Sequence, residues 1–290
     1  MSWRVVAITK RCKLDLRLNY LVVRGDETLR IHLSEISTLI IETTTVSITT
    51  ALLCELTKRK IKVIFCDEKH NPSSELVPYY GSHDTSDKVR VQVKWTEAIK
   101  AEIWTEIIKE KIKNQAILLE RLEKSEAKLL RKYIYEVKLN DETNREGHAA
   151  KVYFNALFGM AFGRNEENYI NSSLNYGYSI ILSAVNREIV SLGYITQLGL
   201  FHDNMFNQFN LSCDLMEPFR PIVDEIVYNM QPKKFDIDEK IILMDALNKE
   251  VIIDNKKQYV NNAIKIYCKS VLDALDSNDI SKMRFYGNEL

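Results

Sequence analysis

Glycine and proline are scarce in this chain, which has 9 Gly and 5 Pro among 290 residues. So few turn-forming residues predict long regular elements joined by few elaborate loops. The five cysteines are odd in number and widely spaced, and no two of them form a C-x-x-C pair. This spacing argues against a structural zinc site or a disulfide framework and is typical of a reducing cytosol.

Long apolar runs are missing as well. The run Ile180–Leu182 is soon interrupted by Asn186 and Arg187, far short of the roughly 18 residues that span a bilayer. The N-terminus lacks a basic stretch followed by apolar residues, so we expect no signal peptide and a cytoplasmic location. G-x-S-x-G, P-loop, G-x-G-x-x-G and H-E-x-x-H motifs are also absent, which argues against the corresponding enzyme classes.

The chain carries no net charge, because 40 Lys and Arg balance 40 Asp and Glu. This balance gives no overall attraction for DNA, yet basic side chains gathered on one face can still bind it. The hydrophobic fraction of 46% and the charged fraction of 28% predict a globular protein. A chain of this length can bury its core as one large domain or two smaller ones.

The first part of the chain predicts a small β-rich domain over residues 1–80. Leu52, Leu53 and Leu56 have helical spacing and predict one helix over 49–59. Runs rich in β-branched or alternating apolar residues predict strands, and Asn-Pro-Ser-Ser predicts a turn at 71–74. The predicted strands cover 4–8, 14–18, 20–23, 28–33, 39–41, 46–48 and 61–65.

A polar stretch of small residues from Gly81 to Asp87 indicates a linker, which we place at 81–92. Beyond it, apolar residues recur every three to five positions and predict a long amphipathic helix. The pattern stays helical to the C-terminus. We therefore expect an α+β chain with a larger all-α catalytic domain over 93–290. The residues of the first helical stripe are Trp95, Ile99, Ile103, Ile107, Ile112, Ala116 and Leu119.

The strongest chemical signal combines one imidazole with carboxylates. His202 precedes Asp214 and Glu217, and these two acids, three residues apart, share one helix face. Glu146 lies at another predicted helix start. Carboxylates and an imidazole that converge from separate helices can hold a divalent metal against a phosphodiester.

Each of these residues also has a structural interpretation. Thr143-x-x-Glu146 matches a capping box, which is commoner than a metal ligand, and Asp214 can cap a helix. Arg220 can neutralise a phosphate or pair with Asp224. A lone histidine such as His202 is more often a hydrogen-bonded structural residue than a ligand.

The prolines that follow Glu217 predict a break in the helix. Pro218 and Pro221 each remove an amide that an uninterrupted helix needs. We therefore expect a kink or a restart between Glu217 and Pro221. Such a break would hold the carboxylates at the edge of a cavity.

Five blocks together resemble the CRISPR-associated adaptation integrases, the larger subunit of the complex that inserts new spacers into CRISPR arrays. The sequence of these blocks is most similar to that of integrases from type II-A systems. The resemblance covers essentially the whole chain, and its blocks are Lys111–Gln115, Glu146–Phe154, Asn171–Tyr178, Gly199–His202 and Asp214–Pro221.

The resemblance implies a site and a reaction. The metal-binding acid of the family falls on Glu146, its imidazole on His202 and its second acid on Glu217, with Asp214 and Arg220 as possible additional residues. It implies a Mg²⁺- or Mn²⁺-dependent endonuclease and integrase that joins prespacer DNA 3′ ends into a CRISPR repeat array, in antiviral defence. It also implies double-stranded DNA as substrate and a homodimer, with two dimers bridged by a small ferredoxin-like subunit into a heterohexamer.

Two other functions are compatible with the same residues. In the first, the chain is a DNA-binding scaffold whose acids cap helices and whose chemistry lies in a partner. In the second, it is a generic metal-dependent DNA nuclease that cuts DNA without joining it.

Overall fold

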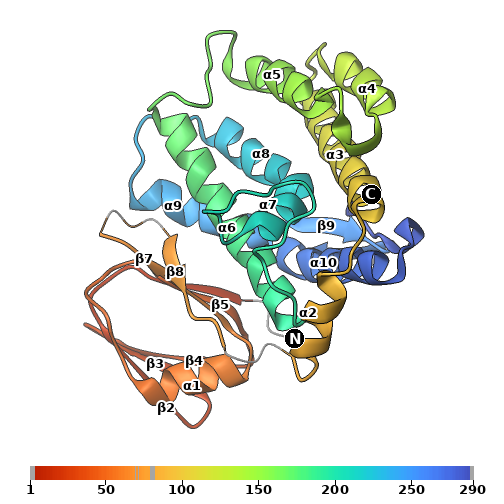
Figure 1. Cartoon of the computed structure of the whole chain (residues 1–290). Helices are drawn as coiled ribbons and strands as arrows, with labels where there is room; N and C mark the ends of the chain where they lie inside the picture. Colours follow the sequence, from red (N-terminus) through yellow and green to blue (C-terminus); the bar gives the residue numbers. More distant parts are fainter. Residues whose placement is uncertain (1–3, 69, 71, 79–81, 288–290) are drawn as a thin grey trace.

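Two small β-sheets build the N-terminal part of the computed structural model, which describes residues 4–68, 70, 72–78 and 82–287. Their strands and the single helix between them lie at the lower left of Figure 1. The elements are β1 (Arg4–Ile8), β2 (Lys13–Arg17), β3 (Tyr20–Arg24), β4 (Thr28–His32), β5 (Ile36–Ile41), β6 (Ser47–Ile48), α1 (Thr50–Lys58), β7 (Lys62–Cys66) and β8 (Pro72–Glu75).

The first sheet has the order β1-β5-β7-β8, in which β1, β5 and β7 are parallel and β8 is antiparallel to β7. All six residues of β5 are buried, as expected of a central strand covered on both faces. The second sheet has the order β4-β3-β2-β6. Leu14, Leu39, Leu52 and Leu56 are fully buried in the core that joins both sheets to α1.

These elements confirm the predicted β-rich domain and its helix. The difference is β8, because residues 72–75 pair with β7 where the sequence predicts a turn. Pro72 is tolerated in β8, since this is an edge strand. The predicted boundary at residue 80 and the start of the linker at Gly81 lie outside the described residues. The later linker residues form α2 (Thr85–Gln92), whose Gln92 side chain hydrogen-bonds the backbone of Ile195 and Leu198.

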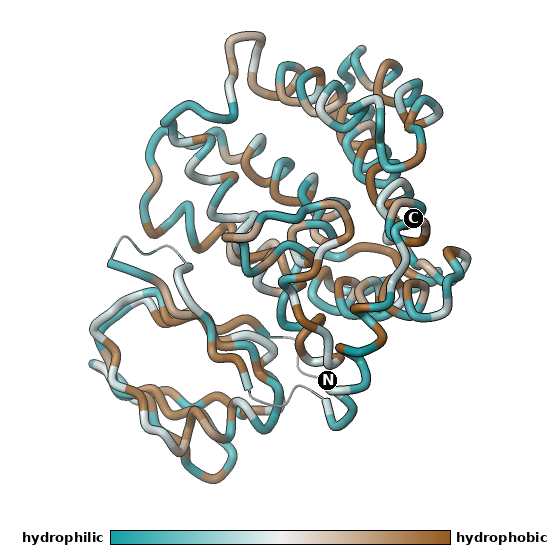
Figure 2. Tube along the Cα trace, in the orientation of Figure 1, coloured by the Kyte–Doolittle hydropathy of each residue, from teal (hydrophilic) through white to brown (hydrophobic). Residues whose placement is uncertain are grey.

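The remainder of the chain is largely helical, as predicted. Figure 2 shows bands of hydrophobic and hydrophilic residues alternating along these helices, which is typical of amphipathic packing. A two-stranded hairpin, β9 (Glu250–Ile253) with β10 (Lys256–Tyr259), is an addition that the sequence pattern did not predict. No helix in the described ranges is long and apolar enough to cross a membrane. The helices are α3 (Glu97–Arg121), α4 (Ala127–Glu136), α5 (Arg145–Phe158), α6 (Tyr169–Ser191), α7 (Asn210–Met216), α8 (Arg220–Met230), α9 (Ile237–Met244) and α10 (Val260–Ser277), with short 3₁₀ turns η1 (Leu139–Asp141), η2 (Glu217–Phe219), η3 (Asp245–Asn248) and η4 (Ile280–Lys282).

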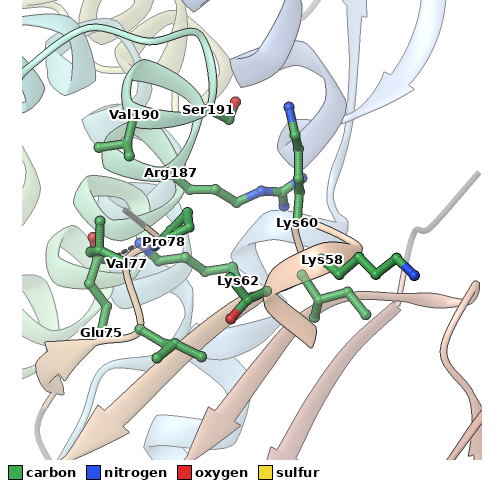
Figure 3. A pocket seen from close by; sticks show the side chains of 12 residues that line it. Lys58, Lys60, Lys62, Glu75, Val77, Pro78, Arg187, Val190 and Ser191 are labelled. Carbon is green, nitrogen blue, oxygen red and sulfur yellow. Dashed lines mark ion pairs between the residues drawn. The ribbon is translucent and has the colours of Figure 1, made fainter. Parts of the chain in front are cut away.

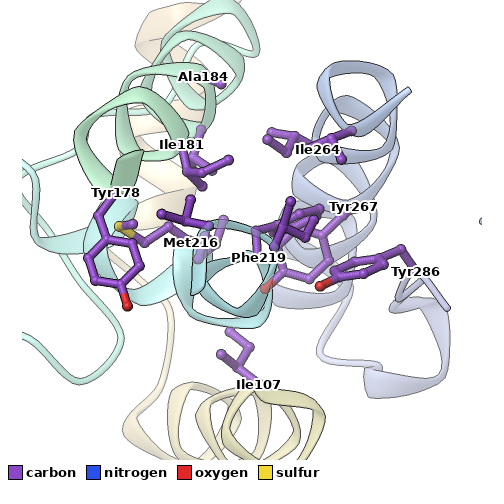
Figure 4. Packing of buried hydrophobic residues seen from close by; sticks show 14 of the residues in the cluster. Ile107, Tyr178, Ile181, Ala184, Met216, Phe219, Ile264, Tyr267 and Tyr286 are labelled. Carbon is purple, nitrogen blue, oxygen red and sulfur yellow. The ribbon is translucent and has the colours of Figure 1, made fainter. Parts of the chain in front are cut away.

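The core of the helical part surrounds the short turn η2 between α7 and α8. Phe219 of η2 is fully buried and stacks on Tyr286, with ring centroids 4.8 Å apart, and its ring also meets Tyr267 edge-on. Figure 4 shows these rings between α6, α10 and α3, with Ile107 of α3 on the opposite side. The turn that carries Glu217 is therefore fixed by packing on several sides.

A buried carboxylate ties α5, α6 and α8 together. Asp224 of α8 is 1% exposed and accepts hydrogen bonds from the hydroxyls of Tyr153 in α5, at 2.9 Å, and Tyr178 in α6. Burial raises the pKa of Asp224 to about 6, although both hydroxyls and the charge of Arg220 act in the opposite direction. The two hydrogen bonds to the Asp224 carboxyl therefore set the positions of α5 and α6 relative to α8.

This elevated pKa makes a pH-dependent contribution to stability. Between about pH 4 and 6 the folded chain holds the Asp224 proton more tightly than the unfolded chain, whose carboxyl has an ordinary pKa of 3.8. The stabilisation is therefore complete below about pH 4 and is lost as the pH rises through 6. Asp224→Asn should remove this dependence, so the free energy of unfolding of the wild type should fall, relative to that of the variant, by on the order of 2 kcal/mol between pH 4 and 6.5.

Urea denaturation at pH 4, 5 and 6.5 measures the effect. Asp26→Asn is the matched control, because Asp26 is exposed. If the wild type and Asp224→Asn keep a constant difference across this range, Asp224 does not titrate as described.

Candidate active site

A single buried lysine joins the two glutamates of the predicted site. Lys111 lies on the buried face of α3, and its Nζ is 2.5 Å from Oε1 of Glu146 and forms a second ion pair with Oε2 of Glu217. The Lys111 side chain is 9% exposed and that of Glu217 is 3% exposed. Because both carboxylates touch one nitrogen, their contacting oxygens lie within two hydrogen-bond lengths, roughly 6 Å, of each other.

Glu146 reaches this position from the first turn of α5. The predicted capping box is wrong, because the N-cap of α5 is Asn144, whose side chain accepts a hydrogen bond from the Gly147 amide. The amides of Arg145 and Glu146 instead donate to the carboxylate of Asp141, at 2.8 and 3.0 Å. With these orphan amides satisfied by other residues, the Glu146 side chain is free to pair with Lys111.

Glu217 stands at the break that the prolines predict. The chain leaves α7 at Met216, passes through η2 and restarts as α8 at Arg220, which confirms the expected interruption. The carbonyl of Pro218 accepts hydrogen bonds from the side chains of Asn114, at 3.1 Å, and Tyr286, at 2.8 Å. The break therefore has fixed partners on α3 and near the C-terminus.

Arg220 neutralises Glu217 from its other side. Its guanidinium lies 2.8 Å from Oε1 of Glu217 and 4.6 Å from the ring centroid of Tyr178. The predicted pairing with Asp224 is not the arrangement found, since Asp224 is hydrogen-bonded to two tyrosines instead. Glu217, which is 2% exposed, thus has a cation at each carboxylate oxygen.

His202 is held by Asp214 rather than by either glutamate. Asp214 is 0% exposed, and it accepts hydrogen bonds from the amides of Leu200, Phe201 and His202 and from the His202 ring, whose Nδ1 is 2.5 Å away. The expected helix-capping role of Asp214 is therefore wrong, because these amides belong to the preceding loop. A Cβ at Gly199 would overlap the His202 carbonyl oxygen and the Asp214 carboxylate, which explains why the loop needs glycine there.

The charges of this group act on one another. Burial raises the pKa of Glu217, but the charges of Arg220 and Lys111 outweigh it and the net effect lowers the pKa. Burial lowers the pKa of Lys111, and the charges of Glu217 and Glu146 outweigh it, so this pKa is raised. The hydrogen bond to Asp214 raises the pKa of His202 against burial, and the charges of Asp214, Glu217 and Glu146 add to the shift.

The donor atoms suit a hard divalent cation. Across the described residues, no three His, Cys, Asp or Glu side chains are already arranged to hold a metal ion. Glu146 and Glu217 nevertheless share one cation, the Lys111 ammonium, and paired carboxylate oxygens are what Mg²⁺ and Mn²⁺ prefer. The residues therefore fit a divalent ion at this position, provided that the ammonium gives way.

The structure brings some predicted residues together and leaves others apart. Glu146 and Glu217 meet at Lys111, and Arg220 joins them through Glu217. Asp214 acts through His202, whose ring makes no hydrogen bond with either glutamate in the part of the chain that the structure describes. Sequence reasoning assigned no role to Lys111. One signal could have revealed it: Lys111 lies four residues after Ile107, on the apolar stripe of the predicted helix. A charged residue on a buried helix face needs a buried partner.

Comparison with known proteins places the chain among relatives. The model of the family described as "CRISPR associated protein Cas1" matches residues 5–255. The "CRISPR-associated endonuclease Cas1" of Neisseria meningitidis serogroup C (strain 8013) is 36% identical over 232 residues, which cover 79% of this chain and 76% of that protein.

Solved structures share the fold at low sequence identity. "Casposase bound to integration product" superposes with a TM-score of 0.76 at 18% identity, covering 97% of this chain and 92% of that one. A chain of a "Cas6-RT-Cas1--Cas2 complex" gives a TM-score of 0.74 at 17% identity, covering 99% of this chain and 36% of that one. With most of its length matched by the family model and more than a third of the aligned residues identical to the Neisseria relative, this chain belongs to the family of CRISPR associated protein Cas1.

Proposed function

We propose that this chain is a divalent-metal-dependent integrase and endonuclease that joins prespacer DNA 3′ ends into a CRISPR repeat array. The observation that carries the proposal is the pair of glutamates, from α5 and η2, that share one buried cation. The Neisseria relative is named an endonuclease, and one structural neighbour is a casposase bound to an integration product; both support DNA as the substrate class.

In the mechanism, Glu146, Glu217 and His202 would hold a Mg²⁺ or Mn²⁺ ion. Such an ion withdraws charge from a scissile phosphate and stabilises the oxyanion that develops during attack by a DNA 3′-hydroxyl or by water. Asp214 fixes His202 through Nδ1, so Nε2 is the nitrogen that would bind the ion or carry a proton. Arg220 keeps Glu217 charged, and phosphate contacts by lysines and arginines position the DNA.

We extend the proposal to the assembly. A structural neighbour is a complex named for Cas1 and Cas2, which supports Cas2 as a partner. The family resemblance supports a small ferredoxin-like form for this partner, and homodimers that it bridges into a heterohexamer. A cytoplasmic location and a type II-A-like origin remain predictions from the sequence. So do the domain limits of 1–80 and 93–290.

Hydrolysis is the second activity that a specific observation favours. The Neisseria relative is named an endonuclease, and the same site can activate water in place of a 3′-hydroxyl. A chain that only cut DNA would release fragments from a branched integration intermediate without resealing the repeat. A chain that served only as a scaffold would bind DNA and give no product with Mn²⁺.

Removal of one carboxylate charge tests the site. Glu146→Gln keeps the size of the side chain but takes away a ligand charge, so joining of a prespacer 3′ end to a repeat-containing plasmid should fall by at least about 100-fold. Glu142→Gln, four residues earlier and exposed, is the matched control and should join at the wild-type rate. Undiminished joining by Glu146→Gln would remove Glu146 from the site.

Lys111→Met tests the competition between lysine and metal. Without its ammonium, Glu146 and Glu217 repel each other, so in EDTA the variant should be destabilised by roughly 3 kcal/mol. Mn²⁺ should restore the charge balance, and it should therefore raise the melting temperature of the variant more than that of the wild type.

The control for this measurement is Lys113→Met. The Lys113 side chain is 44% exposed, and it pairs with Glu110 rather than with either glutamate of the site. Its response to Mn²⁺ should equal that of the wild type. Thermal shifts by Mn²⁺ that are the same in Lys111→Met and wild type would show that the ion binds away from the two glutamates.

A further inference from the structure

A pocket of about 430 Å³ lies between the N-terminal sheets and the helical part of the chain. One wall is the turn between α1 and β7, a second is the segment after β8, and α6 closes the third side (Figure 3). None of its lining residues belongs to the candidate active site, and its size suits a small-molecule ligand.

Two of the basic residues in this pocket are used within the fold. Lys62 is 4% exposed and forms an ion pair with Glu75, which also accepts hydrogen bonds from Ser183 and Asn186. Arg187 lies 3.3 Å from Glu188. Its Nε is buried without a hydrogen-bond partner in the described part of the chain. Figure 3 shows the Arg187 side chain extending from α6 toward Lys60.

The other two cations lack a countercharge. Among the described residues, neither Lys58 nor Lys60 forms an ion pair or a side-chain hydrogen bond. The lining of the pocket therefore contains four cations and one carboxylate, Glu75, which is already paired with Lys62. Burial lowers the pKa of Lys62 well below its ordinary value, and the nearby Arg187 charge adds to this shift.

Lys60 occupies a backbone position that favours glycine. It follows the end of α1 with φ of 56°, in the left-handed region, and its amide bonds the Thr57 carbonyl at 2.9 Å. Glycine is the usual residue at such a helix end, and a lysine there costs about 1 kcal/mol. The chain thus accepts backbone strain at the point where the residue adds a charge to the pocket.

The remaining walls are apolar. Ile61, Leu76, Val77, Pro78 and Val190 provide a hydrophobic surface beside the cations. An inorganic anion alone would leave this surface in water, whereas a ligand with a flat apolar ring and an anionic group would cover both parts.

We propose that this pocket binds a nucleotide, with the base against the apolar walls and the phosphate near Lys60 and Arg187. The choice of a nucleotide over other ring-bearing anions rests on the proposed function in DNA joining. The source is either a free mononucleotide or the terminal nucleotide of a DNA strand. Because the pocket is built by α1, β7, β8 and α6, an occupied pocket would also stiffen the junction between the two parts of the chain.

Lys60→Gly tests the proposal without a folding penalty. The substitution removes one charge and relieves the left-handed strain, so its melting temperature should equal or exceed that of the wild type. Calorimetry in EDTA with dAMP should show one saturable site in the wild type and about tenfold weaker binding in Lys60→Gly. Lys132→Ala, whose side chain is 71% exposed on α4, is the control and should bind as the wild type does.

Two further probes separate the parts of the ligand. Val77→Trp fills the apolar wall without a change of charge and should abolish dAMP binding. A 5′-phosphorylated oligonucleotide that binds more tightly than dAMP and is weakened by Lys60→Gly identifies a strand end as the source, whereas equal or tighter binding of dAMP identifies the free nucleotide.

The proposal is overturned if dAMP does not bind, if Lys60→Gly binds it as tightly as the wild type, or if inorganic phosphate binds as tightly as dAMP. These measurements need neither metal nor a joining reaction. If the chain joins DNA but does not bind dAMP, only this inference is contradicted. If it binds dAMP but does not join DNA, only the proposed function is contradicted.

Discussion

The ion pairs of Lys111 with Glu146 and Glu217 are the contacts on which the site depends. Two carboxylates that meet in a protein interior repel each other, and a buried charge without a partner is destabilising by several kcal/mol. A cation between them removes both penalties at once. The site is therefore a place built to hold positive charge, and a divalent ion supplies more of it than an ammonium group does.

The surrounding fold fixes each acid by different means. Asp141 and Asn144 cap α5 and so orient Glu146. Asn114 and Tyr286 hold the Pro218 carbonyl and so fix the turn of Glu217. The buried Asp224 then links α8 to α5 and α6 through tyrosine hydroxyls. These hydrogen bonds hold the two acids in place from separate elements, as a preorganised site requires.

Much of the architecture could be predicted because it depends on local patterns. The strands from β1 to β7 and the long α3 follow from apolar periodicity, and the break at Glu217 follows from two prolines that each lack an amide. The hairpin β9–β10 was missed because the apolar spacing around it also fits a helix. Strand β8 was missed because its Pro-Ser-Ser sequence is typical of a turn, whereas residues 72–75 return along β7 after a short connection.

The site was predictable only in part. Glu146 and Glu217 were found from motifs, but the capping box failed because Asn144 adopts a left-handed conformation, with φ of 50°, and takes the N-cap position itself. Asp214 was expected to cap a helix, whereas three loop amides and an imidazole meet its carboxylate. Such roles depend on tertiary contacts between distant segments, and sequence spacing does not contain them.

A crystal of the protein soaked in Mn²⁺ gives the most direct measurement of the central claim, through the anomalous scattering of the ion. The account predicts one strong anomalous peak within ligand distance, about 2.2 Å, of carboxylate oxygens from both Glu146 and Glu217, with the Lys111 side chain displaced. A peak bound to neither glutamate, with Lys111 still between them, would contradict it.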